Sequence, residues 1–298
     1  MDHPAFLVIG AMKAGTTSLF RDLMQSPAIH LPEKEPACLV RYSDADAPAA
    51  YCKLFRQARS GQIVGESSTG YSMLPLYPGI PERAMKILGR DLRILYLVRN
   101  PIHRTLSHHY HAMSYRDAPA DPVEALKSQP LLIEASRYAM QLDPWLALYP
   151  AAQVRVIIAE EYYAARNNIV NEICRFLGVP EVGLASTTVH GAGEERRIGR
   201  WSAVRKSGWY RRRLAPYLPP HARKAASRLL LAKGPARPLP PDMDCLLRLR
   251  DVFLPDVENL TRRIGRSSQP WDLDETIRRL AESRNKRGIG AGEAAADL

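Results

Sequence analysis

The segment from Phe6 to Phe20 constrains the fold of this chain more than any other, because it combines a strand, a loop and the start of a helix. Four apolar residues end at Gly10, a short loop carries Lys13 and Gly15, and three hydroxyl residues, Thr16–Ser18, open a helical pattern. At such a junction, backbone N–H groups without helical partners and the positive end of the helix dipole both attract an anion. The segment therefore predicts a phosphate-binding loop between a buried strand and a helix.

The loop differs from a Walker A loop in the position of its lysine. The spacing from Gly10 to Gly15 fits the first part of a Walker A loop, but Thr16 stands where that loop needs its lysine. The only loop lysine, Lys13, lies between the two glycines. We therefore expect a phosphorylated donor held by a lysine within the loop, without the usual contacts to a γ-phosphate and magnesium.

Apolar runs alternate with helical patterns along most of the chain. Strands are expected at residues 6–9, 62–66, 92–98 and 154–158, and helices at 16–26, 48–60, 101–115, 136–149 and 167–177. This alternation predicts an α/β fold, with a P-loop-like parallel β-sheet flanked by helices on both faces. Ligands of open α/β sheets bind beyond the carboxyl ends of the strands. Lys13, Glu66 and Arg99 each follow a predicted strand, so we expect them to share one crevice.

A single domain is expected over residues 1–284, with a helical, basic C-terminal region. Within it, residues 196–241 read as a variable insertion that is rich in basic residues and proline. A helical pattern returns at residues 242–264. Residues 285–298 combine several glycines with small and charged residues, which predicts a disordered tail.

The net charge of +11 predicts an anionic partner, such as a nucleotide, a sulfated or phosphorylated glycan, a nucleic acid or an acidic membrane. The four cysteines and the histidines of residues 103–111 lack the spacing of metal ligands, so no metal site is expected. The first strand follows almost directly on Met1, and no apolar run reaches the ~20 residues of a membrane span. We therefore expect a soluble, cytoplasmic protein without a transmembrane segment.

Several candidate site residues allow more than one interpretation. Arg99 offers planar donors suited to phosphate, with Ser107 nearly two helical turns further on, but it also fits a structural pair with a carboxylate. Glu66 is the last residue of a buried strand, where desolvation raises the pKa of a carboxylate and suits it to act as a general base. It also fits a structural carboxylate that caps a helix or forms a salt bridge. Residues 196–228 form a block rich in basic and aromatic residues. This block fits the solvated faces of amphipathic helices, an electropositive wall over the bound donor, or a surface that binds nucleic acid.

Together these residues resemble the sulfotransferases that use 3′-phosphoadenosine 5′-phosphosulfate (PAPS), in the branch that includes the heparan sulfate and other carbohydrate enzymes. Gly10–Leu19 is similar to the 5′-phosphosulfate loop of that family, and Tyr96–Ser107 to its 3′-phosphate motif. Lys34-Glu35-Pro36 resembles the segment that follows the first helix, and Gly65–Tyr71 the segment with the catalytic glutamate. The resemblance covers residues 5–180 and 240–272. Two departures are Cys38-Leu39 in place of an aromatic pair, and Ser67 in place of a lysine.

The resemblance implies a sulfuryl transfer from PAPS to a hydroxyl or amine, most simply of a carbohydrate, with no metal and no nucleic acid. It implies that Lys13 stabilises the leaving group and that Glu66 is the base. The donor-binding residues that it implies are Lys13, Ala14, Gly15, Thr16, Thr17, Ser18, Arg99 and Ser107. From their position in a basic loop, Arg197 or Arg200 is expected to close over the nucleotide. Other functions left open are sulfation of a lipid or secondary-metabolite hydroxyl, a P-loop nucleotide kinase, and a basic nucleic-acid-binding protein.

Overall fold

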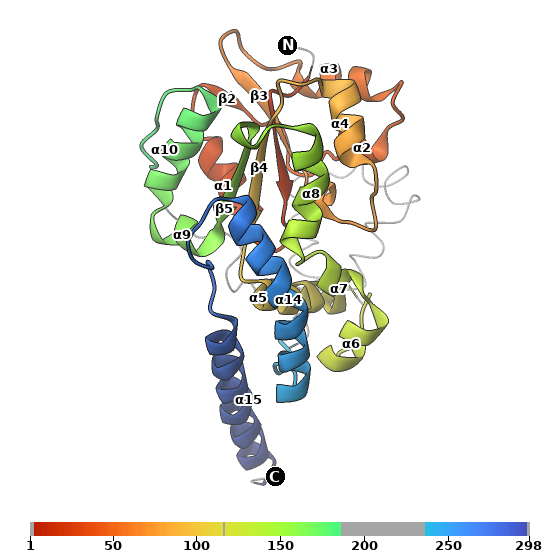
Figure 1. Cartoon of the computed structure of the whole chain (residues 1–298), viewed down its shortest axis with the longest axis vertical. Coiled ribbons are helices and arrows are strands. Elements are labelled where there is room, and N and C mark those ends of the chain that lie inside the picture. The colour runs from red at the N-terminus through yellow and green to blue at the C-terminus, as the bar shows by residue number, and fades with distance from the viewer. Residues whose placement is uncertain (1–2, 116, 186–235, 297–298) are drawn as a thin grey trace, which may run out of the picture.

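Five parallel strands form the centre of the computed structural model, in the order β2-β3-β1-β4-β5 (Figure 1). The structure describes residues 3–115, 117–185 and 236–296, with side chains described as far as residue 286. The strands are β1 (Phe6–Gly10), β2 (Ile29–His30), β3 (Ile63–Ser67), β4 (Arg93–Val98) and β5 (Val154–Ile158). The predicted α/β fold with a parallel sheet is confirmed.

Helices cover both faces of this sheet. Figure 1 shows α1 and α10 on one side of the strands and α4 and α8 on the other. The helices of the described residues are α1 (Thr16–Leu23), α2 (Cys38–Arg41), α3 (Ala47–Phe55), α4 (Ile80–Leu88), α5 (Pro101–Ser114), α6 (Pro122–Ser128), α7 (Leu131–Glu134), α8 (Tyr138–Leu148), α9 (Ala159–Ala164), α10 (Arg166–Leu177), α14 (Met243–Arg263) and α15 (Leu273–Ala296), with 3-10 turns η1 (Thr69–Ser72) and η2 (Ala151–Gln153).

The central strands β1 and β4 are apolar because helices cover both of their faces. All residues of β1 are buried, and only the first residue of β4 is partly exposed. Their side chains form the middle of a core that extends into α8, α10 and α14. Since all strands are parallel, their carboxyl ends meet at one edge, where the loops to α1, η1 and α5 begin.

A buried ion pair anchors α1 behind the loop that precedes it. Arg166 donates to both carboxylate oxygens of Asp22, from Nη2 at 2.6 Å and from Nε at 3.0 Å. Both side chains are less than 5% exposed, and the hydroxyl of Tyr162 also donates to Asp22. Such a pair fixes the position of α1 relative to α9 and α10, because removing either partner leaves a buried charge.

One strand was not expected from the sequence. Residues 29–30 pair with β3 as the short edge strand β2. Two residues are too few to show a strand pattern in the sequence. The helix α15 extends to Ala296, and the expectation of a disordered tail at residues 285–298 stays a prediction. The domain boundaries stay predictions.

Within the described ranges, no helix has the length and apolar character needed to cross a bilayer. The basic block at residues 196–228, with Arg197 and Arg200, lies outside the described residues.

Candidate functional site

The loop between β1 and α1 is tight because glycine occupies its crowded positions. A Cβ on Gly10 would lie 1.9 Å from Oγ of Ser72, and one on Gly15 would lie 2.3 Å from Oη of Tyr163. Gly15 also has a φ of 106°, which glycine adopts without strain. Lys13 is half-buried at a φ of 75°, a conformation that costs a non-glycine residue roughly 1 kcal/mol. The packing around the loop therefore holds Lys13 in one place at the carboxyl edge of the sheet.

The three hydroxyl residues at the start of α1 have different surroundings. Thr17 is exposed, whereas Thr16 is 5% exposed and Ser18 is fully buried. Oγ of Ser18 accepts a hydrogen bond from Tyr163 at 3.4 Å. Ala14 is buried as well, so it offers a ligand only its backbone. The first-turn N–H groups of α1 and the Thr17 hydroxyl are thus the groups of this helix best placed for an anion.

Arg99 lies at the junction of β4 and α5, which several contacts fix. The side chain of Asn100 caps α5 by accepting two backbone N–H groups of the first turn. Its amide donates to Oγ1 of Thr276 on α15 at 2.9 Å. The backbone N–H of Asn100 donates to Oε1 of Glu160 at 3.0 Å. The chain therefore leaves β4 in a set direction, with the side chain of Arg99 just beyond the strand.

A cavity of 220 Å³ beside this junction is lined by Arg99, His103, His109 and Arg237, together with apolar residues of α5, α6, α15 and the segment 238–240. Burial lowers the pKa of His103, and the positive charges of Arg99 and Arg237 lower it further, against the opposing charge of Glu160. Two guanidinium groups on one small cavity make it suitable for an anion. Ser107 is half-buried further along α5 and is not among the lining residues.

The structure brings the predicted donor-binding elements to one edge. Gly10 of β1 pairs with Tyr96 of β4, so the loop with Lys13 and the residue Arg99 follow neighbouring strands. The charge of Lys13 also acts on His108, the neighbour of Ser107 on α5. Burial, the charge of Arg104 and then the charge of Lys13 lower the pKa of His108 to about 3. The crevice expected beyond the strand ends is therefore bordered by the loop and by α5.

Glu66, the predicted base, is enclosed by the protein. Its side chain is 1% exposed. One carboxylate oxygen accepts hydrogen bonds from Tyr71 Oη at 2.5 Å, Ser68 Oγ at 2.7 Å and the Cys38 N–H at 3.2 Å. The other accepts from Tyr51 Oη at 2.7 Å. Burial raises the pKa of Glu66 and these four hydrogen bonds oppose the rise. In this arrangement the carboxylate ties β3 to α2, α3 and η1, and both of its oxygens accept hydrogen bonds from the protein.

Glu35 is a carboxylate at the same edge that the sequence analysis did not single out. Its side chain is 41% exposed. One oxygen accepts the backbone N–H of Thr69 at 2.8 Å, and the other accepts Nζ of Lys34 at 2.5 Å. Its own N–H donates to the carbonyl of Ser67 at 2.9 Å, so it lies at the carboxyl end of β3. The signal in the sequence was a glutamate between lysine and proline in the segment between the first helix and the next.

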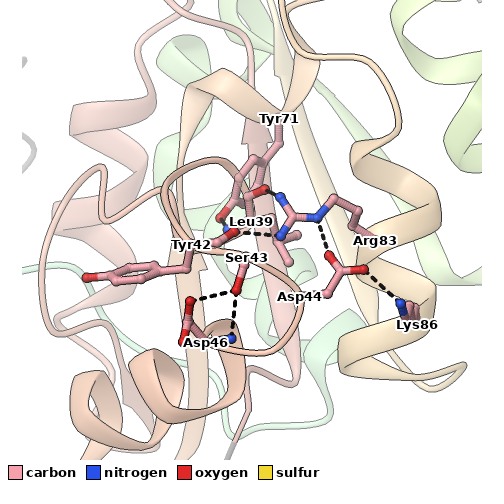
Figure 2. Close-up of polar contacts among 8 residues, drawn as sticks. All are labelled: Leu39, Tyr42, Ser43, Asp44, Asp46, Tyr71, Arg83 and Lys86. Carbon is pink, nitrogen blue, oxygen red and sulfur yellow. Dashed lines mark hydrogen bonds and ion pairs between the residues drawn. The ribbon is translucent and has the colours of Figure 1, made fainter.

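Arg83 of α4 clamps the segment that follows Glu35 (Figure 2). Its Nε pairs with Oδ1 of Asp44 at 2.7 Å, and its Nη2 donates to the carbonyl of Tyr42 at 2.7 Å. Its Nη1 donates to the carbonyl of Leu39. A single guanidinium group therefore holds both the end of α2 and the loop beyond it.

The same segment is held from its other side by the network around Glu66. The hydroxyl of Tyr71 accepts the N–H of Leu39 at 2.9 Å while donating to Glu66. The N–H of Ala37 donates to Oγ of Ser68 at 2.9 Å, and that hydroxyl also donates to Glu66. The short helix α2 is thus fixed between the end of β3 and α4, and so is the position of the neighbouring Glu35.

Two other features of the described residues lie apart from this edge. A cavity of 420 Å³ borders β5, and none of the predicted site residues line it. Within the described ranges, no group of three or more His, Cys, Asp or Glu residues could hold a metal ion. The expectation that no metal is used stays a prediction.

Comparison with known proteins gives consistent matches. Residues 78–190 match the family model described as the sulfotransferase domain. The chain is 26% identical over 191 residues to heparan sulfate glucosamine 3-O-sulfotransferase 3B1 of Mus musculus, an alignment that covers 60% of this chain and 47% of that protein. It is 26% identical over 211 residues to the bifunctional heparan sulfate N-deacetylase/N-sulfotransferase of Drosophila melanogaster, covering 59% of this chain and 20% of that protein. The chain thus spans half or less of the length of these two relatives.

Among solved structures, a sulfotransferase from Alicyclobacillus acidocaldarius matches with a TM-score of 0.60 at 24% identity. The match covers 91% of this chain and 99% of that one. The two proteins share a fold.

Proposed function

We propose that the chain is a sulfotransferase, which its matches to the sulfotransferase domain and to heparan sulfate sulfotransferases support, and that it transfers a sulfuryl group from PAPS to a hydroxyl or amine of an acceptor. The observation that carries the proposal is that two anion-binding elements lie at one edge of the sheet: the loop with Lys13 and the positive cavity beside Arg99. PAPS carries one anionic group at each of two positions of its ribose, so two such elements match its shape.

The residues at this edge fit the two ends of the donor. PAPS, when bound, supplies an activated sulfuryl group whose leaving group is 3′,5′-ADP. Backbone N–H groups of the loop and the hydroxyls of Thr16 and Thr17 hold the 5′ side. Arg99 binds the 3′-phosphate, with Ser107 as the second predicted ligand. Arg197 and Arg200 remain predicted ligands outside the described residues.

Lys13 is the residue that we assign to the leaving group. Its ammonium neutralises the charge that develops on the bridging oxygen as the bond from sulfur to that oxygen breaks. At the same time the acceptor oxygen or nitrogen forms its bond to sulfur and gives its proton to a carboxylate. This transfer depends on alignment and electrostatics, and the rigid loop provides both.

Two carboxylates are candidates for that proton. Glu66 is the base predicted from the sequence, but it would have to exchange four internal hydrogen bonds for an acceptor. Glu35 is open to solvent and fixed at the carboxyl end of β3. A base must come within hydrogen-bond reach of the acceptor, so we assign this role to Glu35 first and keep Glu66 as the alternative.

A carbohydrate is the acceptor that we propose. The two relatives described above are named as heparan sulfate enzymes, and a chain with a net charge of +11 attracts acidic glycans. The second candidate is a hydroxyl of a lipid or secondary metabolite. A cytoplasmic location stays part of the proposal.

The first experiment is incubation of the purified full-length chain with labelled PAPS and a panel of glycans, lipids and phenols, together with a thermal-shift titration by 3′,5′-ADP. We expect label on a glycan and a higher melting temperature with 3′,5′-ADP. Absence of any shift at saturating 3′,5′-ADP would reject the proposed donor. Label on a lipid or phenol alone would replace the carbohydrate by the second acceptor class.

Two further assays test the other classes of function. Magnesium-dependent ATP turnover that survives Lys13→Ala would indicate a nucleotide kinase. Binding to DNA or RNA that falls steeply with salt and does not depend on Lys13 or Arg99 would indicate a nucleic-acid-binding protein.

A further inference from the structure

Arg104 of α5 is a completely buried cation with an unusual set of contacts. Its side chain is 0% exposed. It donates to the carbonyl of Ala135 at 3.1 Å, the carbonyl of Leu132 at 2.9 Å and Nδ1 of His108 at 2.7 Å. Each of these partners is neutral. A buried guanidinium has a high desolvation cost, so contacts that keep it in place define the positions of its partners closely.

The contact with Arg104 determines which nitrogen of His108 carries the proton. A guanidinium group has five N–H donors and no acceptor. Nδ1 of His108 must therefore accept, and the proton of the neutral ring lies on Nε2. The charged and titratable groups that act on this ring are Arg104, Lys13 and His109, and all of them oppose a second proton.

This arrangement makes His108 a hydrogen-bond donor and unsuitable as a base. The ring is 7% exposed, and within the described residues it is held by the hydrogen bond from Arg104 to Nδ1. It lies beside Ser107 on α5 and close enough to Lys13 to be affected by its charge. An anion held by Lys13 thus has a fixed N–H group as its neighbour.

We infer that His108 is a donor-contact residue, whose Nε2–H binds an oxygen of the sulfuryl group beside Lys13 and whose tautomer is set by Arg104. The inference rests on the proposed function and deepens it. A neutral N–H group binds a sulfuryl oxygen without depending on pH, and the buried Arg104 keeps it aimed as charge moves towards the leaving group.

The test compares PAPS with 3′,5′-ADP, because the two differ by the sulfuryl group. Asparagine at position 108 places an oxygen near the position of Nδ1 and keeps a partner for Arg104, but it removes the Nε2 donor. Glutamine places an amide N–H near the position of Nε2. In equilibrium titrations without acceptor, we expect His108→Asn to weaken PAPS binding about 10- to 100-fold while 3′,5′-ADP binding stays within about twofold. His108→Gln should recover most of the lost affinity.

The matched control is His111→Asn on the same helix, since the ring of His111 packs against Tyr115, with ring centroids 4.9 Å apart. This variant should leave the ratio of the PAPS and 3′,5′-ADP affinities unchanged. An unchanged ratio in His108→Asn would overturn the inference while the proposed function stands. If the unaltered chain binds neither nucleotide, the proposed function fails and the inference fails with it.

The tautomer has an independent readout that requires no activity. Nitrogen-15 NMR of the imidazole groups, with His108→Asn used to assign the signal, should show a proton on Nε2 and none on Nδ1 between pH 6 and 8. A doubly protonated ring or the opposite tautomer in this range would contradict the role given to Arg104.

Discussion

The loop at residues 10–15 and the segment at residues 34–46 border the same edge of the sheet, but the protein holds them in different ways. The loop takes its shape from its own glycines, which permit contacts that a Cβ would prevent. The segment is held by side chains from other elements: Glu66 and Tyr71 bind it through a shared network, and Arg83 binds it through Tyr42 and Asp44 (Figure 2). The donor side of the proposed site is therefore encoded locally, whereas the acceptor side depends on distant residues.

The largest effect is expected from the carboxylate that the segment presents. We predict that Glu35→Gln lowers kcat about 100- to 10,000-fold, because it removes the proton acceptor, with little change in melting temperature or 3′,5′-ADP affinity. Its counterpart, Glu66→Gln, should keep most of its activity. It should lose about 1–3 kcal/mol of stability in denaturant unfolding, because an amide N–H₂ then replaces one acceptor oxygen among buried donors.

The reverse pattern would restore the assignment made from the sequence. Loss of transfer in a stable Glu66→Gln variant, with Glu35→Gln active, would identify Glu66 as the base. It would also mean that α2 moves during the reaction to open the pocket around Glu66.

The two carboxylates also show what the sequence can predict. Strands β1, β3, β4 and β5, the loop with Lys13 and the placement of Arg99 after β4 were predicted correctly, because each depends on apolar patterns and glycine spacing over a few residues. The burial of Glu66 depends on Tyr51 and Tyr71, which no local pattern links to it. The exposure of Glu35 depends on the pairing of residue 34 with Ser67. Contacts of this kind appear only when the chain is folded.

On the donor side, Lys13→Ala should lower kcat about 100- to 1000-fold, as expected when one charge-stabilising group is removed from a transition state. The matched control is Lys86→Ala, whose ammonium is 70% exposed and pairs with Asp44. It should change kcat less than about twofold. Initial rates at saturating PAPS measure both variants. More than a tenth of the activity remaining in Lys13→Ala would show that the loop lysine does not act on the leaving group.

A smaller effect is expected at Arg83, which tests whether the acceptor side depends on its distant support. Arg83→Lys keeps a positive charge near Asp44 but cannot donate to the Leu39 and Tyr42 carbonyls together. We expect kcat to fall roughly 10-fold through misplacement of Glu35, with the KM for PAPS unchanged. Arg263→Lys, at the exposed pair with Asp143, is the control. A rise in the KM for PAPS with constant kcat would place the effect of Arg83 on the donor side.

The last prediction concerns stability in acid and not the rate of transfer, and it shows that the donor side also contains one group held by distant contacts. Burial, Arg104, Lys13 and His109 lower the pKa of His108 from 6.5 to about 3. Below pH 6.5 the unfolded chain therefore binds a proton that the folded chain does not, and stability falls as pH falls, by about 1.4 kcal/mol per pH unit for this group. Between pH 7.5 and pH 4.5 the unaltered chain should lose about 2–3 kcal/mol more than His108→Asn in denaturant unfolding. Equal losses in the two proteins would mean that the ring accepts a proton in the folded state, and Arg104 would then not control it.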